Sequence, residues 1–328
     1  MFDIITFGSA TKDIFLSTKE STIVESNKLS TGVGMCFPMG SKIKTDEIYF
    51  TSGGGGTNTA VTFAKQGFSV AFCGKIGDDN VGKNIINDLK QYKISTDFVT
   101  KTNERPTNHS IIIDVPNIDR TIFVYRGAAE LHNENDVPFS KLISQWFYLA
   151  PFSPYTEPLF CKLIEFALEK GTKIMANPSK KQLQSKKTRE MLKNVDILLL
   201  NTEEASILTE TPVKEINTVI EKTINFTKDI VLVTQGVEGV TAFQNNMFYR
   251  IKPINPNAVD RTGAGDSFGS GFLSEFIRSK NVENALQLGV ANSTSCLQKK
   301  GAKNGLLNKD DKYSLNPLIK NKELKLME

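Results

Sequence analysis

The sequence predicts an α/β fold: a doubly wound, mainly parallel sheet flanked by helices, from which a small β-sheet projects as a lid. Two observations carry this prediction. Short, almost continuously apolar runs alternate with helical patterns along most of the chain, and a polar, turn-rich stretch interrupts that alternation near the N-terminus. The 328 residues, 39% of them apolar, are enough for one large core. We therefore expect a single domain over residues 1–328, with the lid inserted in the α/β core.

The strands of the main sheet are expected at short apolar runs of the kind that a parallel sheet buries on both faces. These runs are Ile4–Phe7, Val70–Cys73, Phe147–Ala150, Lys173–Ala176, Asp196–Leu200 and Ile230–Val233. Helical patterns between them include Asn80–Gln91 and Glu157–Lys170. Ligands of such sheets bind beyond the carboxyl ends of the strands, where this chain has Asn177, Asn201 and Thr234. The functional site is expected at that edge.

The lid is expected from two segments, residues 13–52 and 108–127. In the first, apolar runs at Ile14–Leu16 and Ile48–Phe50 alternate with Gly, Pro and Ser. In the second, Ser110–Arg126 has the alternating apolar residues of a hairpin that turns near Pro116 and Asn117. We expect these strands to form one small sheet. Its exposed edges also offer a surface for a homodimer.

Composition argues against several classes of function. The net charge of +4 comes from 40 basic and 36 acidic residues spread along the chain, so we expect no nucleic-acid partner. No apolar run is long enough to span a membrane, and the charged N-terminus does not resemble a signal peptide, so no membrane partner is expected. Four separated cysteines without a C-x-x-C pair are typical of reduced thiols in a cytoplasmic protein. Two histidines are too few for a histidine-rich metal site.

Two common nucleotide-binding motifs are missing. No G-x-G-x-x-G follows the first strand, which argues against a dehydrogenase. The segment from Gly77 to Lys83 nearly matches a P-loop, but Asn84 stands where Ser or Thr would reach a magnesium ion. Nucleotide binding would therefore need a different loop.

The segment Asp260–Asp266, DRTGAGD, suits phosphoryl transfer. Small residues from Gly263 to Gly265 leave main-chain N–H groups uncovered at the start of a helix, which the apolar spacing of Phe268 and Phe272 predicts. A helix N-terminus attracts anions, so this turn can serve as an anion hole. Asp266, in the first turn, can take the proton of an attacking hydroxyl. An ordinary glycine-rich helix start, with Asp266 stabilising the dipole, is the alternative.

A second glycine-rich segment, Ser52–Asn58, precedes another expected helix. Its four adjacent glycines let the backbone approach a ligand, and Asn58 supplies both a donor and an acceptor. A flexible loop is the alternative interpretation. The pattern G-x-x-G-x-D-x-x-G follows from Gly74 to Gly82, directly after the next strand.

Ser52–Asn58 together with Gly74–Gly82 resembles the first signature of the ribokinase-like, or PfkB-type, carbohydrate kinases, and Asp260–Asp266 resembles the second. The resemblance extends from Gly8 to about Leu307. It implies a ribokinase-like fold and an ATP-dependent kinase that phosphorylates a small carbohydrate. In that family pattern Asp266 is the catalytic base, and Gly263, Ala264 and Gly265 form the anion hole.

The resemblance also implies roles for residues outside the second signature. The sugar-binding residues it implies are Asp13, Gly54, Gly55 and Asn58. The nucleotide-binding residues it implies are Asn201, Thr234, Gly236 and Gly239. Glu204, in the N-x-x-E pattern with Asn201, would organise Mg²⁺ through water. Ribokinases proper have Lys at the position of Gly55, so ribose itself is in question as the substrate.

Many relatives bind a monovalent cation, K⁺, behind the anion hole. The matching positions here are Asp260 and the carbonyl groups of Thr262, Cys296, Lys299 and Gly301. The chain departs from the pattern at Gly305, where some relatives have a Ser ligand. Lys299 and Lys300 also bring positive charge to this place.

The sequence therefore predicts an ATP-dependent sugar kinase. A nucleoside kinase of the same fold is one alternative, since lid aromatic residues such as Phe15, Phe37 and Tyr125 could stack on a base. A sensor that binds a sugar or nucleotide without catalysis is another. An intact Asp266 beside the glycine turn argues against the sensor.

Overall fold

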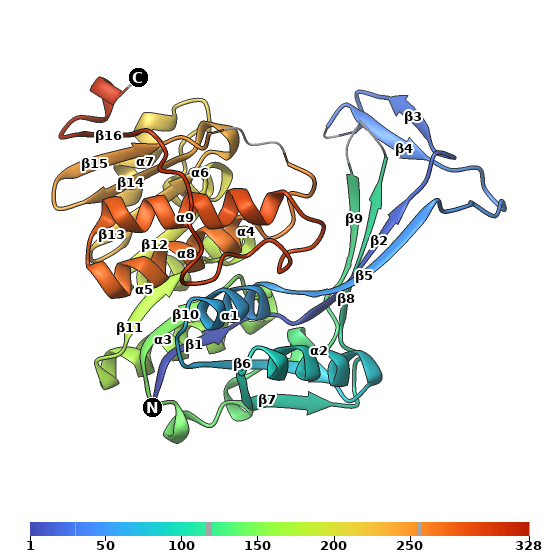
Figure 1. The fold of residues 1–328 in the computed structure, drawn as a ribbon, viewed down its shortest axis with the longest axis horizontal. Coiled ribbons are helices and arrows are strands. Elements are labelled where there is room, and N and C mark those ends of the chain that lie inside the picture. The colour runs from blue at the N-terminus through green and yellow to red at the C-terminus, as the bar shows by residue number, and fades with distance from the viewer. Residues whose placement is uncertain (30, 116–119, 255–257, 328) are drawn as a thin grey trace.

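The chain folds into an α/β body and a smaller β-sheet that projects from one side of it (Figure 1). The computed structural model describes residues 1–29, 31–115, 120–254 and 258–327. The predicted fold class is confirmed: the main sheet is largely parallel and carries helices on both faces.

The main sheet has ten described strands in the order β16-β15-β14-β13-β12-β11-β10-β1-β6-β7. In chain order they are β1 (Phe2–Phe7), β6 (Val70–Gly77), β7 (Ser95–Thr102), β10 (Ser144–Leu149), β11 (Lys173–Ala176), β12 (Ile197–Asn201), β13 (Ile230–Thr234), β14 (Val240–Gln244), β15 (Met247–Ile251) and β16 (Leu318–Asn321). The strands from β13 to β7 are parallel, and every predicted apolar run lies in this part. Antiparallel pairing adds β14, β15 and β16 at one edge.

Alternate residues of the strands point into two separate hydrophobic clusters, which explains why the strands are apolar throughout. Ile4 and Leu199 belong to one cluster, and Ile5 and Leu198 belong to the other. The first cluster is covered by α1 (Gly55–Lys65), α2 (Asn80–Gln91), α8 (Ala264–Ser279) and α9 (Val282–Leu297). The second is covered by α3 (Glu157–Lys170), α4 (Lys180–Leu183), α5 (Lys186–Leu192), α6 (Thr202–Thr209) and α7 (Ile216–Thr223).

Short 3₁₀ helices join several of these elements. They are η1 (Ala128–Leu131), η2 (Glu134–Asp136), η3 (Phe139–Lys141), η4 (Pro154–Thr156), η5 (Ile224–Phe226), η6 (Gly236–Glu238) and η7 (Leu324–Met327). None of the helices in the described ranges is both long and apolar enough to cross a membrane.

The strand order reverses between β1 and β10. From β1 the chain moves outward through β6 to β7, then returns to β10 on the other side of β1 and continues through β11 and β12 to β13. A crevice opens at such a switch point, beyond the carboxyl ends of the strands. The N-terminus of α1 lies there, because a Cβ placed on Gly8, after β1, would be 3.0 Å from the Gly56 nitrogen. The glycine-rich loop therefore borders the crevice.

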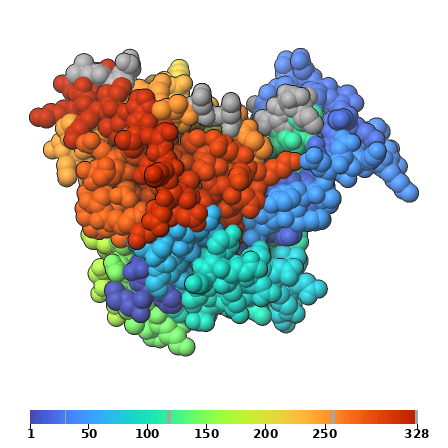
Figure 2. Space-filling model, in the orientation of Figure 1, coloured from blue at the N-terminus to red at the C-terminus, as the bar shows by residue number. Residues whose placement is uncertain are grey.

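The lid sheet consists of β5, β2, β8 and β9 in that order. These strands are β2 (Thr11–Ser17), β5 (Glu47–Gly53), β8 (Asn108–Asp114) and β9 (Arg120–Tyr125). The β8–β9 pair is antiparallel as predicted, and the turn expected near Pro116 and Asn117 lies outside the described residues. A further hairpin of β3 (Thr22–Glu25) and β4 (Val33–Cys36) extends from the lid, and Figure 2 shows this part standing clear of the body.

Candidate active site

Helix α8 begins at the crevice with the predicted glycine turn. Gly263 is its N-terminal cap, in a left-handed conformation with φ of 78° that only glycine adopts without strain. A Cβ at this position would lie 2.4 Å from the Cβ of Ala302, so the turn rests directly on the loop after α9. At Gly265 the space is open. The first N–H groups of α8 thus face a free volume, as an anion hole requires.

Asp266 lies in the first turn of α8, beside the glycine-rich loop. The Asn58 side-chain nitrogen donates a hydrogen bond of 2.9 Å to its Oδ2. Its Oδ1 lies 3.4 Å from the place where a Cβ on Gly55 would be, so a larger residue there would crowd the carboxylate. Burial raises the pKa of Asp266, while the Asn58 hydrogen bond and the charge of Lys303 lower it. The two predicted signatures therefore meet at one carboxylate.

Asp13 faces the same crevice from the lid sheet. It lies within β2, two residues after that strand begins. Its side chain lies against Gly53, where a Cβ would be 1.9 Å from Asp13 Oδ2. The carboxylate is 4% exposed, and burial raises its pKa to about 6, although a hydrogen bond from Ser110 opposes that shift.

Lys303 is a site residue that sequence reasoning missed. Its ammonium group is buried and donates hydrogen bonds to the hydroxyls of Ser52, at 3.0 Å, and Thr57, at 2.9 Å. Burial lowers its pKa to about 8, and the charges of Asp88, Asp13 and Asp266 act in the opposite direction. The lysine therefore connects the glycine-rich loop electrostatically with both crevice carboxylates.

Three of the four predicted nucleotide-binding residues line a cavity of about 580 Å³, and Asn201 is not among its lining residues. Thr234, Gly236 and Gly239 form one wall of it, and Ala264 and Gly265 of the predicted anion hole form another. Apolar residues of α9, such as Val290 and Leu297, and the hydroxyl residues Ser293 and Thr294 complete it. A cavity of this size and character can hold a nucleotide with its phosphates at the N-terminus of α8.

Asn201 and Glu204 form a capping box at the start of α6. The Asn201 side chain accepts a hydrogen bond of 2.9 Å from the Glu204 nitrogen, and Glu204 Oε2 accepts one of 2.8 Å from the Asn201 nitrogen. Burial raises the pKa of Glu204, and the Asn201 hydrogen bonds lower it. Asn201 pairs with Thr234 across β12 and β13, so the motif borders the cavity that Thr234 lines. The role in Mg²⁺ binding stays a prediction.

At the expected cation position, Asp260 is already paired with a positively charged residue, Arg120. Asp260 is buried and accepts hydrogen bonds from the Thr262 and Gly301 nitrogens and from Arg120 of the lid. Cys296, also predicted here, is buried with its sulfur 3.9 Å from the Thr262 carbonyl oxygen. Lys299 is an exposed residue of the loop after α9. The described residues contain no cluster of three or more His, Cys, Asp or Glu side chains that would bind a metal ion.

The second half of the first signature supports the lid. Asp79 caps α2 by accepting a hydrogen bond of 2.7 Å from the Gly82 nitrogen, and it also accepts bonds from the nitrogen and hydroxyl of Thr107. Thr107 stands directly before β8. Asp79 therefore fixes the point where the chain enters the lid.

Comparison with known proteins identifies the family of this chain. The model of the pfkB family carbohydrate kinases matches residues 23–309. This chain therefore belongs to the pfkB family of carbohydrate kinases. A ribokinase of Staphylococcus aureus (strain COL) is 29% identical over 270 residues, which are 80% of this chain and 88% of the relative. A ribokinase of Haemophilus influenzae is 28% identical over 260 residues, 77% of this chain and 83% of the relative.

Solved structures confirm the ribokinase-like fold. The structure of Arabidopsis thaliana ribokinase complexed with ribose and ATP has a TM-score of 0.77 at 23% identity, covering 94% of this chain and 96% of that one. A Methanocaldococcus jannaschii nucleoside kinase has a TM-score of 0.75 at 21% identity, with the same coverage of 94% and 96%. Family and relatives together support a sugar kinase function, that is, phosphoryl transfer to an alcohol group.

Proposed function

We propose that this chain is an ATP-dependent kinase that transfers the γ-phosphoryl group to a primary hydroxyl of a small carbohydrate. One observation carries the proposal: the Asp266 carboxylate lies in the first turn of α8, whose open N-terminus borders the nucleotide cavity, and Asn58 orients it. A base and an anion hole are thereby held on the same rigid element, which favours catalysis.

The reaction follows from these positions. Asp266 accepts the proton of the acceptor hydroxyl. The hydroxyl oxygen forms a bond to the γ-phosphorus of ATP, and the bond between the γ-phosphorus and the β–γ bridging oxygen breaks. The N–H groups of Gly263, Ala264 and Gly265 hold the phosphoryl oxygens on which charge develops. ATP would supply the phosphoryl group, and bound Mg²⁺ would neutralise charge on its phosphates.

Each side of the transfer has its own binding residues. We assign Thr234, Gly236 and Gly239 to the nucleotide, because they line the cavity that ends at the anion hole. Asn201 lies at the border of that cavity, and Glu204 would hold Mg²⁺ through water with the carboxylate oxygen that the capping box does not use.

The acceptor side is formed by Asp13, Gly54, Gly55 and Asn58. The buried Oδ1 atom of Asn58 has no hydrogen-bond partner among the described residues, so it is available to a sugar hydroxyl. Asp13 can accept bonds from two hydroxyls once it is ionised. Gly55 leaves space next to Asp266 for the reacting hydroxyl.

The variant Asp266→Asn tests the assignment of the base. Loss of a general base lowers turnover about 10²- to 10⁴-fold, while nucleotide affinity should stay within a few fold of wild type because Asn preserves the shape. Turnover is measured by coupled ADP release and nucleotide affinity by calorimetry. Asp310→Asn, an exposed residue of the loop after α9, is the control and should leave both values unchanged. Full turnover of Asp266→Asn would refute the proposal.

An acceptor panel distinguishes the remaining candidates. Pentoses, hexoses, sugar phosphates and nucleosides are each offered with ATP and Mg²⁺. Transfer to a sugar supports the proposed function, whereas transfer to nucleosides alone would favour a nucleoside kinase. Ligands that raise the melting temperature without any release of ADP would instead indicate a sensor.

We also propose that a second copy of the chain covers the outer face of the lid sheet. Register places Ile14, Phe50, Ile111 and Phe123 side by side across all four strands. The large apolar residues on this face that are 38% to 58% exposed are Ile48, Phe50, Ile111, Phe123 and Tyr125. Such a continuous apolar patch marks an interface, and two copies related by a twofold axis would each bury the same patch.

Sedimentation velocity tests the dimer. Phe123→Glu should convert a dimer into a monomer at micromolar concentration, because it places a charge on the most exposed residue of the patch. Val213→Glu, an apolar residue of the body that is 45% exposed, is the matched control and should not change the mass. A wild-type protein that sediments as a monomer contradicts the proposal.

A further inference from the structure

The carboxylate of Asp260 joins three separate segments of the chain. The Arg120 guanidinium donates to its Oδ1 at 2.7 Å, and the Thr262 nitrogen donates to the same oxygen at 2.9 Å. The Gly301 nitrogen donates to Oδ2 at 2.8 Å. Arg120 begins lid strand β9, Thr262 precedes α8, and Gly301 follows α9. The lid therefore contacts the loop that leads into the anion hole.

These contacts determine where the anion hole lies. Thr262 stands next to Gly263, the cap of α8, and Gly263 rests on Ala302, the residue after Gly301. A shift of Asp260 would move both sides of this contact. Because catalysis depends on geometry within a fraction of an ångström, such a shift would weaken the grip on the transferring phosphoryl group.

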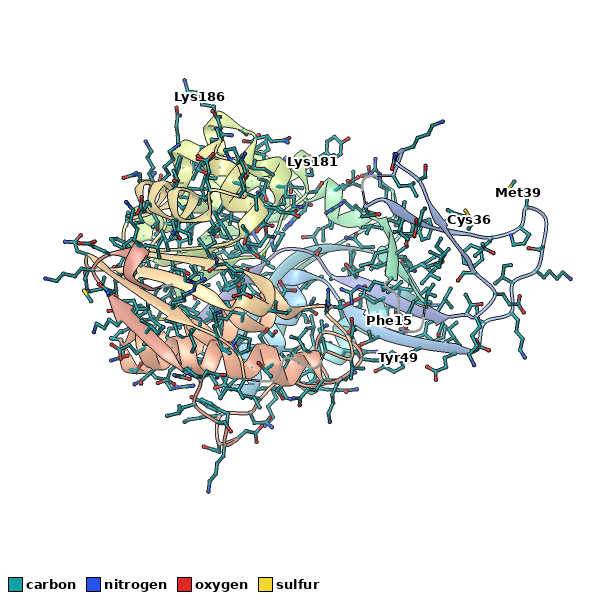
Figure 3. The ribbon with its side chains drawn as sticks, turned by 90° about the horizontal axis from the view of Figure 1, so that it is seen from above. Phe15, Cys36, Met39, Tyr49, Lys181 and Lys186 are labelled. Atoms are coloured by element: carbon teal, nitrogen blue, oxygen red, sulfur yellow. The ribbon has the colours of Figure 1, made fainter. Side chains whose placement is uncertain are left out.

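The buried carboxylate of Asp260 needs a positively charged partner. Its side chain is 5% exposed, and that of Arg120 is 22% exposed. A cavity of about 40 Å³ beside the pair is lined by Phe15, Tyr49 and Ile112 and also by the charged residues Glu47, Asp114 and Lys300, and Figure 3 shows Phe15 and Tyr49 close together at the base of the lid. Because Asp260 itself is almost fully buried, its attraction to Arg120 is strengthened and an unpaired carboxylate there would be unfavourable. The guanidinium stays charged at every pH that the protein meets.

The same contacts do not fit a monovalent metal ion at the position that the family resemblance suggests. Both oxygens of Asp260 already accept hydrogen bonds. The Lys299 nitrogen donates to the Cys296 carbonyl oxygen at 3.2 Å. An ion would have to displace these donors and would lie near the guanidinium of Arg120, which repels it.

We propose that Arg120 is the built-in cation of the anion hole, a positioning residue by which the lid holds the loop before α8, so that phosphoryl transfer by this chain requires no monovalent metal ion. The proposal rests on the proposed kinase function for its catalytic consequence. Its structural part, the need of Asp260 for a cation, can be tested without turnover.

The first experiment measures how the turnover of the wild-type protein depends on the monovalent cation. Turnover with ATP, Mg²⁺ and a saturating acceptor is measured in the chlorides of potassium, sodium and choline at equal ionic strength. We expect the three rates to agree within about twofold, because Arg120 supplies the charge in every case. A rate in potassium that is more than about fivefold higher than in choline would overturn the proposal.

The second experiment removes the charge. Arg120→Met keeps the length of the stem, and its kcat should fall about tenfold or more while KM for ATP changes little, since the loss concerns the geometry of the transition state. Arg120→Lys should stay within about threefold of wild type. Guanidinium ion at about 10 mM should raise the rate of Arg120→Met at least threefold and leave the wild type unchanged. A merely structural arginine would show no such rescue.

The matched control is Glu47→Gln. Glu47 of β5 forms an exposed ion pair with Lys300, so it also connects the lid to the loop after α9, but it does not contact Asp260. Its rate should stay within about twofold of wild type. Equal losses in Glu47→Gln and Arg120→Met would show that any tether of the lid suffices and would overturn the proposal.

Melting curves separate this proposal from the kinase function. If the wild-type protein phosphorylates no acceptor, the proposed kinase function is wrong. The need of Asp260 for the charge of Arg120 is then tested by thermal stability alone. Guanidinium ion should then raise the melting temperature of Arg120→Met but not that of wild type. If Arg120→Met does not fold, the ion series with wild type and the rate of Arg120→Lys decide the question, and a potassium requirement of wild type refutes the proposal.

Discussion

Replacing Asp13 by asparagine should make the folded protein more stable and the enzyme worse. Burial raises the pKa of Asp13 from 3.8 to about 6, so the folded state favours the neutral acid. The stability that this group contributes is therefore present below pH 3.8 and is lost as the pH rises through 6. One pKa unit corresponds to about 1.4 kcal/mol, so the ionised carboxylate costs about 3 kcal/mol above that range.

Asparagine has a similar shape and no charge at any pH. Because Lys303 loses an attractive partner in the variant, we expect a net gain of about 1 to 3 kcal/mol in the free energy of unfolding near pH 8, and a smaller gain near pH 5. The loss of charge-assisted bonds to acceptor hydroxyls should lower kcat/KM about 10- to 100-fold. The gain in stability and the loss of activity therefore have the same cause, a carboxylate kept ionised in a buried place.

Urea unfolding at the two pH values measures the stability, and coupled ADP release measures kcat/KM. Asp310→Asn serves again as the control, since this exposed carboxylate should change neither quantity. A variant Asp13→Asn that is less stable than wild type near pH 8, or whose difference from wild type does not depend on pH, would refute the reasoning.

Three further variants test the crevice. Lys303→Met removes a charge that lowers the pKa of Asp13 and Asp266, so the acidic limb of the pH–rate profile should move to higher pH, and an unmoved limb would contradict this. Asn58→Leu removes the hydrogen bond to Asp266 and should lower kcat about 10- to 100-fold, with the acidic limb again moved upward. Gly263→Ala introduces a methyl group that clashes with Ala302, so it should lower both stability and turnover. Its control is Gly171→Ala, which is strained but lies in open space and should lower stability alone. Thermal melts measure the stability of both variants, and ADP release measures their turnover.

The parallel core could be predicted because its strands are buried on both faces and leave an unbroken apolar pattern. The antiparallel edge could not, since β16 contains Lys320 and depends on β15 rather than on its own pattern for its place in the sheet. The lid strand expected at Ile14–Leu16 extends over Thr11–Ser17 because it pairs with both β5 and β8. Tertiary pairing sets the bounds of the strand in both cases.

Within the site, local motifs were easier to predict than long-range contacts. The turn before α8 and the loop before α1 have their own glycine patterns, so both were found. Lys303 was missed because lysines are almost never fully buried, although the small residues Gly301 and Gly305 on either side of it indicate tight packing. Arg120 was missed because its partner Asp260 is distant in the chain and adjacent only in the fold.

The two halves of the site come from different parts of the molecule. The proposed nucleotide cavity is built by β13, η6, α8 and α9 of the body, whereas the proposed acceptor side is built by β2 and by the junction of β5 with α1. They meet at the N-terminus of α8, where Asp266 faces Gly55. Because no lid residue lines the nucleotide cavity among the described residues, changes in the lid strands should alter KM for the acceptor and leave KM for ATP unchanged. Substrate choice in this chain can therefore vary through the lid while the phosphoryl donor site stays the same.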